Sequence, residues 1–85
     1  MKRLEEEVGE VTHYFPKISV AVVALKAPLA VGDRIAIRGI TTNLQQTVAS
    51  MQIEHENVTK AKAGQSIGLK VDQRVREKDR VFKIL

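Results

Sequence analysis

Short stretches in which every second residue is apolar run through most of the sequence. Arg34–Arg38 reads RIAIR, with Ile35 and Ile37 on one side, and Ser66–Asp72 repeats the pattern. A period of two places successive side chains on opposite faces of a β-strand, so one face can be buried while the other meets solvent. No window shows a convincing helical period. The sequence therefore predicts an all-β fold.

Turn and loop residues separate these stretches into about six or seven short strands. Ile18–Leu25 is apolar on both faces, which suggests a central strand or one covered on both sides. Thr41–Gln46 and Arg74–Asp79 are expected to be loops. Short strands at this spacing favour a sandwich or a barrel, and closure into a barrel would remove open sheet edges. The expected strands are Val8–Phe15, Ile18–Leu25, Arg34–Arg38, Thr47–Glu54, Asn57–Lys62, Ser66–Asp72 and Val81–Leu85.

A small antiparallel β-barrel is therefore the predicted fold class. We expect one domain over residues 8–85, preceded by a charged lead-in, frayed or briefly helical, over residues 1–7. Ala36 is expected to point outward with Arg34 and Arg38. The side chains expected in the core are Ile35, Ile37, Ala49, Met51, Ile53, Ile67, Leu69, Val71 and Val81.

Cysteine is absent from the 85 residues. This removes disulfides, thiolate metal sites and cysteine nucleophiles, and it fits a reducing compartment. The charged start MKRLEEEV predicts no signal peptide. The longest apolar run, Val20–Leu25, is far shorter than the roughly 20 residues that span a bilayer. We therefore expect a cytoplasmic protein without a membrane segment.

Groups that could perform catalysis are scattered. His13 and His55 fall on different predicted strands, and the serines and glycines form neither a nucleophile elbow nor a phosphate-binding loop. Glu54 and Glu56 flank His55 in a way that is reminiscent of a metal patch, although a polar strand end explains the same residues. We expect the isolated chain not to be an enzyme and to need no cofactor and no metal.

Positive charge is concentrated near the C-terminus. The net charge is +4, and residues 58–85 hold eight basic and three acidic side chains. Such a skew favours a polyanionic partner, while a solvated, solubilising surface is the alternative. A hairpin around Gly64 would place Lys60, Lys62 and Lys70 on one outer wall. The nucleic-acid-binding candidates are Arg34, Arg38, Lys60, Lys62, Lys70, Arg74 and Arg76.

The order of short motifs resembles a known family. GDRIAIRG, then TVASMQIEHENVTKAKAGQSIGLKV, then REKDRVFKI resembles the second domain of elongation factor Tu and its relatives. The segments VGEVTHYFPKISVAVVAL, GITTN, SMQIEH and VREKDRVFKI are more similar still to the C-terminal barrel of the collagenase-like bacterial peptidases. The resemblance covers about residues 8–84, and Asp79-Arg80 departs from it where the factors usually place a glycine. It implies a β-barrel, either freestanding or excised from a larger enzyme.

The elongation-factor resemblance also implies a site. The pocket that holds the acceptor end of aminoacyl-tRNA in that factor falls here on Gln52, His55, Gln65 and Ser66. The factor has an acidic residue, an arginine, an acidic residue and an asparagine at those positions. Recognition of aminoacyl-adenosine is therefore not implied, although a binding surface at the same turn is.

Two functions follow from these features. The first is a non-catalytic RNA-binding or ribosome-associated module, since the peptidases of the resembled family are linked to modification of ribosomal and transfer RNA. Such a module would use its basic face to bind tRNA, rRNA or a protein of translation or RNA modification. The second is a protein-interaction or substrate-recruiting accessory barrel of a peptidase-type enzyme.

Overall fold

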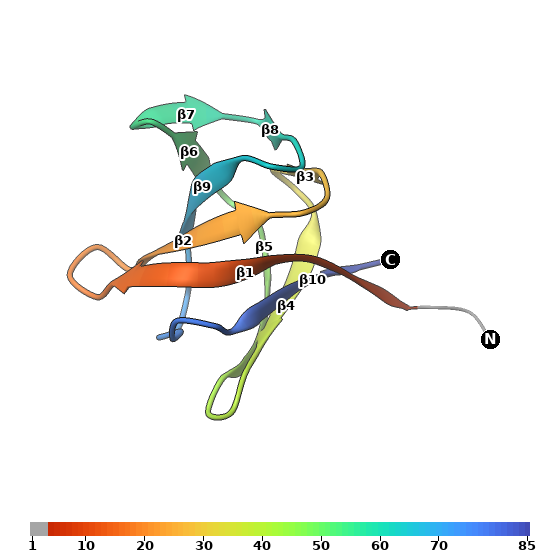
Figure 1. Ribbon diagram of the computed structural model, residues 1–85, viewed down its shortest axis with the longest axis vertical. Helices are drawn as coiled ribbons and strands as arrows, with labels where there is room; N and C mark the ends of the chain where they lie inside the picture. Colours follow the sequence, from red (N-terminus) through yellow and green to blue (C-terminus); the bar gives the residue numbers. More distant parts are fainter. Residues whose placement is uncertain (1–3) are drawn as a thin grey trace.

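Ten β-strands make up the fold in a computed structural model that describes residues 4–85 (Figure 1). The strands are β1 (Glu5–Phe15), β2 (Val20–Leu25), β3 (Leu29–Ala30), β4 (Arg34–Arg38), β5 (Asn43–Thr47), β6 (Met51–Ile53), β7 (Glu56–Val58), β8 (Lys60–Ala61), β9 (Ser66–Lys70) and β10 (Arg80–Ile84). All pairings are antiparallel, so the all-β, antiparallel prediction is confirmed.

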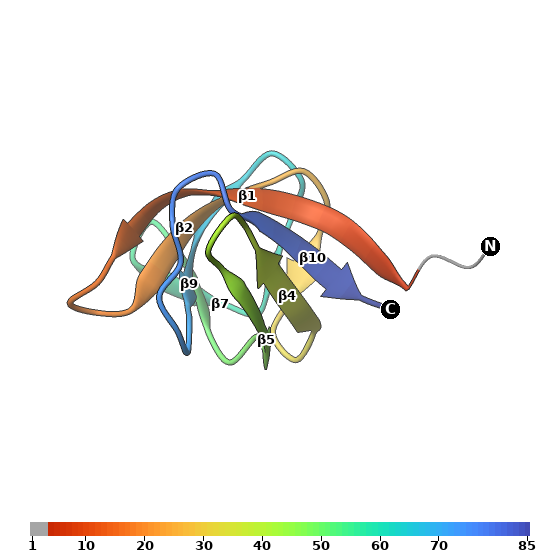
Figure 2. The same ribbon diagram turned by 90° about the horizontal axis from the view of Figure 1, so that it is seen from below.

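Eight strands form one sheet in the order β5-β4-β10-β1-β2-β9-β6-β7, and β3 pairs with β8 separately. The sheet curls around a single core (Figures 1 and 2). Within residues 4–85 its two outermost strands, β5 and β7, are not paired with each other. The predicted strand number was too low. The stretch expected as one strand over residues 57–62 is divided between β7 and β8, and β3 and most of β5 lie where no strand was expected.

β1 is the strand around which the sheet bends. It lies between β10 and β2. Its pairing with β10 shifts register between Glu7 and Gly9, and its pairing with β2 shifts register between Val11 and His13. Each shift marks a β-bulge, which bends a strand and increases its twist. Figure 2 shows the resulting long, curved strand. The bend lets a sheet of short strands enclose a core.

The core contains most of the side chains that the alternation predicted. Ile35, Ile37, Met51, Ile67, Leu69, Val71 and Val81 are all buried, as predicted. Two predictions were wrong. Ala36 is buried because its short side chain lies opposite Phe82 on the neighbouring strand β10. Ala49 is exposed because the chain leaves the sheet after β5 and rejoins it only at β6.

The predicted loop at residues 41–46 is also wrong, because most of it is strand β5. Leu44 and Gln46 are buried, and their neighbours are exposed. The Gln46 amide donates from Nε2 to the carbonyl oxygen of Lys70 at 2.8 Å, and its Oε1 accepts from the backbone N–H of Asp72 at 2.8 Å. A side-chain amide thus joins outer strand β5 to the end of β9.

The predicted lead-in at residues 1–7 is wrong for its second half, since β1 begins at Glu5; residues 1–3 lie outside the described part of the chain. Ion pairs explain why charged residues continue the strand. Glu5 accepts two hydrogen bonds from Arg38, and Glu7 accepts from Lys26 and Arg80. These contacts lower the pKa of both carboxyl groups. The hydrogen bond from Arg38 lowers the pKa of Glu5, and the hydrogen bond from Lys26 lowers the pKa of Glu7 most, followed by that from Arg80.

The lowered pKa of Glu7 predicts a pH-dependent stability. A carboxyl group with a depressed folded-state pKa stabilises fully above its ordinary value of 4.5, and this contribution is lost as pH falls through the folded-state pKa. We expect Glu7→Gln to lower the melting temperature at pH 7 and to approach wild type as pH falls through the lowered pKa of Glu7. Glu6→Gln is the control, because Glu6 is exposed and forms no ion pair within residues 4–85. Melting curves across pH that fall in parallel for wild type and Glu7→Gln would contradict this.

Candidate functional site

A groove crosses the outer face of β2, β9 and β6. In the register of these strands, Gly68 lies directly between Val22 and Gln52. Gly68 has no side chain, so the space between its neighbours is open. A Cβ atom placed there would meet Val20 Cγ1 at 3.4 Å and Gln52 atoms only at 3.9 Å and beyond. The groove has a volume of about 250 Å³.

One wall of the groove is apolar and partly exposed. Phe15, the last residue of β1, is 45% exposed, and Ile18, in the turn between β1 and β2, is 56% exposed. Val20 and Val22 continue this wall along β2. The apolar pattern over residues 18–25 correctly indicated a central strand, but only its inner face is fully buried. Side chains of this size exposed together are typical of a binding surface.

The opposite wall is polar and includes a strained turn. Glu54 and His55 are the two residues between β6 and β7, and their φ angles are +50° and +67°. A two-residue hairpin turn with two positive φ angles favours Asn-Gly, and larger side chains are uncommon there. Both side chains line the groove, together with Gln52 and Ser66. The fold therefore holds two unfavourable residues at the rim of the groove.

Three of the four positions implied by the elongation-factor resemblance meet in this groove: Gln52, His55 and Ser66. Gln65 does not line it. The Gln65 side chain instead accepts a hydrogen bond from the backbone N–H of Lys62 at 2.7 Å and closes the turn before β9. Sequence reasoning missed the apolar wall, which forms only when the β1–β2 turn folds beside β9.

The predicted lysine wall is wrong. Lys60 lies in β8, which pairs with β3 and not with β9, so no hairpin around Gly64 brings it beside Lys70. Lys62 follows β8, in the turn before β9. Lys70 is at the far end of β9, opposite Val20, and its Nζ donates to the carbonyl oxygen of Ile18 at 2.8 Å.

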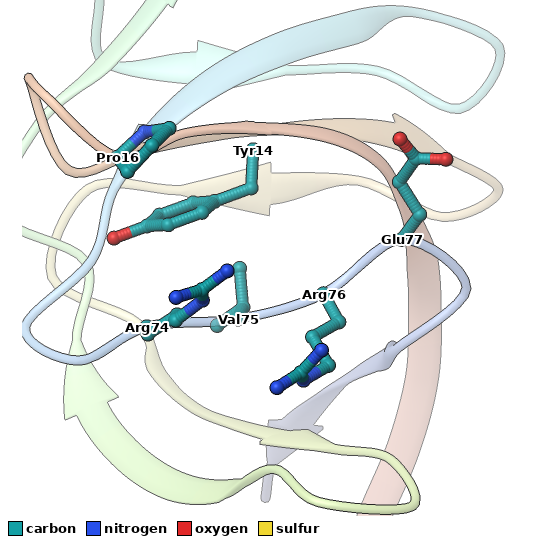
Figure 3. Close-up of a pocket in the computed structure, with 6 residues that line it drawn as sticks. All are labelled: Tyr14, Pro16, Arg74, Val75, Arg76 and Glu77. Carbon is teal, nitrogen blue, oxygen red and sulfur yellow. The ribbon is translucent and has the colours of Figure 1, made fainter.

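The remaining candidate arginines lie on β4 and on the loop before β10. Arg38 is held by Glu5 and lies over the Phe82 ring at 5.5 Å, while Arg34 contacts Thr47 Oγ1 at 3.4 Å. Arg74 and Arg76 line a second cleft of about 470 Å³ beside Tyr14 (Figure 3). Arg76 also lines a third cleft, of about 240 Å³, together with Arg38. Lys60, Lys62 and Lys70 line neither of these two clefts.

The two histidines belong to different elements. His13 packs edge-on against Phe15 at 4.3 Å between ring centroids, and its Nδ1 lies 3.7 Å from Glu77. His55 belongs to the strained turn. Over residues 4–85, no group of three or more His, Asp or Glu side chains is arranged to hold a metal ion. No helix in that part of the chain is long and apolar enough to cross a membrane.

Known proteins share sequence similarity with most of this chain. No family model matches the chain. An uncharacterized protease of Methanocaldococcus jannaschii is 44% identical over 77 residues, which is 89% of this chain and 19% of the protease. A collagenase of Porphyromonas gingivalis is 34% identical over 83 residues, which is 95% of this chain and 23% of the collagenase. The chain is homologous to the collagenase-like peptidases.

The fold agrees with that relationship. The crystal structure of the C-terminal domain of a putative U32 peptidase from Geobacillus thermoleovorans superposes with a TM-score of 0.87 at 22% identity, covering 94% of this chain and 93% of that one. Its selenomethionine variant gives a TM-score of 0.85 at 22% identity, over 89% of this chain and 96% of that one. The predicted likeness to the C-terminal barrel of collagenase-like peptidases is confirmed. The chain spans about a fifth of the length of the curated relatives it matches.

Proposed function

We propose that this domain is a non-catalytic accessory module that binds an extended polypeptide for a peptidase-type enzyme. The observation that supports it best is the groove over Gly68, with an apolar wall on β2 and a polar wall on β6 and the following turn. The relatives bear the names protease and collagenase, and a polypeptide is the ligand that those names suggest. The catalytic function would belong to the remaining four-fifths of such proteins.

The groove chemistry suits an extended chain. Side chains on an extended backbone alternate, so those on one side can enter the apolar wall at Ile18 and Val22. The peptide groups of the ligand need hydrogen-bonding partners, which the Gln52 amide and the Ser66 hydroxyl supply on the other wall. Glu54 adds a negative charge at the rim. A polypeptide with apolar residues two apart fits this arrangement.

The strained turn provides a prediction that separates stability from binding. Glu54→Asn/His55→Gly places favoured residues at both positive φ angles and should raise the free energy of unfolding by about 1–2 kcal/mol. It also removes two side chains from the groove, so polypeptide binding should weaken. Thermal unfolding and binding are measured on the same variant. A variant that is stabilised and binds as well as wild type would mean that Glu54 and His55 have no role in recognition.

Binding to immobilised gelatin, followed by surface plasmon resonance, tests the proposed function. We expect saturable binding by wild type and about tenfold weaker binding by Ile18→Ser, which removes a partly exposed apolar side chain. Gly68→Val should weaken binding similarly by filling the groove. Gln45→Val is the control, since Gln45 is exposed on β5 outside the groove. Absence of gelatin binding by the folded wild-type domain would overturn the proposal.

An RNA-binding or translational role is the other function suggested by the sequence. The relatives named above lend it no support. The pairing of β8 with β3 also removes the hairpin that would have placed Lys60 and Lys62 beside Lys70.

A further inference from the structure

A second cleft lies on the other side of the β1–β2 turn from the groove. Tyr14, Pro16, Arg74, Val75, Arg76 and Glu77 line it, and its volume is about 470 Å³. Tyr14 and Phe15 are successive residues of β1, so their side chains leave the strand on opposite faces. Phe15 therefore lines the groove while Tyr14 lines this cleft. The two sites can be altered separately.

Buried contacts fix the positions of the two arginines. Val75 is 1% exposed and anchors the loop in the core, and Arg74 and Arg76 on either side of it are exposed. The backbone N–H of Arg76 donates to Asp79 Oδ2 at 2.8 Å. The loop is also tied to β1, because the N–H of Val11 donates to the carbonyl oxygen of Asp79 at 2.8 Å. The backbone that carries both guanidinium groups is therefore held in place before any ligand arrives.

The charges of these arginines are not matched by protein carboxylates. Arg38 and Arg80 form ion pairs with glutamates, but Arg74 and Arg76 form none within residues 4–85. The acidic side chain of the cleft, Glu77, points away from both guanidinium groups (Figure 3) and lies 3.7 Å from His13 Nδ1. The cleft thus presents two positive charges to solvent.

We propose that the cleft formed by Tyr14, Arg74 and Arg76 is a binding site for a phosphate monoester. Each guanidinium offers a planar pair of N–H donors, and the Tyr14 hydroxyl can add another. A phosphate monoester carries close to two negative charges and three strong acceptor oxygens, which matches this set better than a carboxylate does. The Tyr14 ring, Pro16 and Val75 provide apolar surface for the organic group of the ester (Figure 3).

Calorimetric titration with phenyl phosphate tests this site, with benzoate as the matched carboxylate. We expect phenyl phosphate to bind wild type with a dissociation constant on the order of 1 mM or lower, about tenfold more tightly than benzoate. Arg74→Gln/Arg76→Gln should lower its affinity about tenfold or more. Lys60→Gln/Lys62→Gln removes the same charge outside the cleft and should leave the affinity within about twofold of wild type.

Three results would overturn the site. The first is no saturable binding of phenyl phosphate by folded wild type, and the second is equal loss of binding in the lysine control. The third is binding of benzoate as tight as that of phenyl phosphate, which would make it a carboxylate site. Single-stranded RNA without a terminal phosphate is a further probe: binding that depends on Arg74 and Arg76, without phenyl phosphate binding, would replace the proposal with recognition of phosphodiesters. Gelatin binding should be unchanged in Arg74→Gln/Arg76→Gln.

Discussion

Gln46→Met should lower the free energy of unfolding by about 1–3 kcal/mol. The Gln46 side chain is 3% exposed and satisfies the carbonyl oxygen of Lys70 and the N–H of Asp72, both at 2.8 Å. Methionine has a similar length and leaves little cavity, but it pairs with neither group. A protein hydrogen bond contributes about 0.5–1.5 kcal/mol net, and two part-buried bonds are lost here. The free energy of unfolding of a domain of this size is roughly 4–13 kcal/mol, so the expected loss is a large fraction of it.

The control for this substitution is Gln45→Met, one residue earlier on β5. Gln45 is exposed, so its replacement should change the free energy of unfolding by less than about 0.5 kcal/mol. Urea unfolding curves of both variants give the comparison. Similar midpoints for the two variants would mean that the Gln46 amide does not hold β5 to the end of β9.

Gly9→Ala should be the second strongly destabilising change, by about 1–3 kcal/mol. A Cβ atom at Gly9 would lie 2.7 Å from the carbonyl oxygen of Ala24 and 2.8 Å from Val23 Cγ1. The first of these is backbone in the middle of the sheet and has little room to move, because β1 is paired on both sides. Overpacking of this kind typically costs about 1–3 kcal/mol. Alanine also lowers the conformational entropy of the unfolded chain, but this gain in stability offsets only part of the cost of overpacking.

Gly68→Ala is the matched control on β9. Its Cβ would make an ordinary contact with Val20 Cγ1 at 3.4 Å, so the variant should be neutral or more stable by up to about 1 kcal/mol. Thermal unfolding of both alanine variants shows the difference. Equal melting temperatures for Gly9→Ala and wild type would show that β1 and β2 are not closely packed at Gly9.

Alternation predicted the strands whose inward residues are aliphatic and missed those whose inward residues are polar. Arg34–Arg38 is found with its bounds unchanged, because Ile35 and Ile37 make the period of two visible. β5 was missed because one of its two buried residues is Gln46, whose burial depends on a partner 24 residues away. Glu5 and Glu7 were missed for a similar reason, since the cations that make them strand residues come from other strands and loops.

The groove could be predicted in part. The resemblance to the elongation factor marked Gln52, His55 and Ser66, which the fold brings together. Gly68, alone in the middle of an alternating strand, is a local signal of open space or close approach that the sequence analysis did not use. The apolar wall depends on how the β1–β2 turn lies against β9. The prediction that Lys60, Lys62 and Lys70 share one outer wall was wrong. Strand pairing decides which residues share a face, and the spacing of the lysines does not encode that pairing.

The most direct test of the central claim maps polypeptide binding onto the domain. Backbone amide resonances of the labelled domain are followed by NMR during titration with gelatin peptides. If the groove is the binding surface, the largest shifts will occur at Ile18, Val22, Gln52 and Gly68, and amides of β4 and β5 will not move. Shifts centred on β4 and β5, or none at saturating peptide, would contradict the assignment of this domain as a polypeptide-binding module that uses the groove.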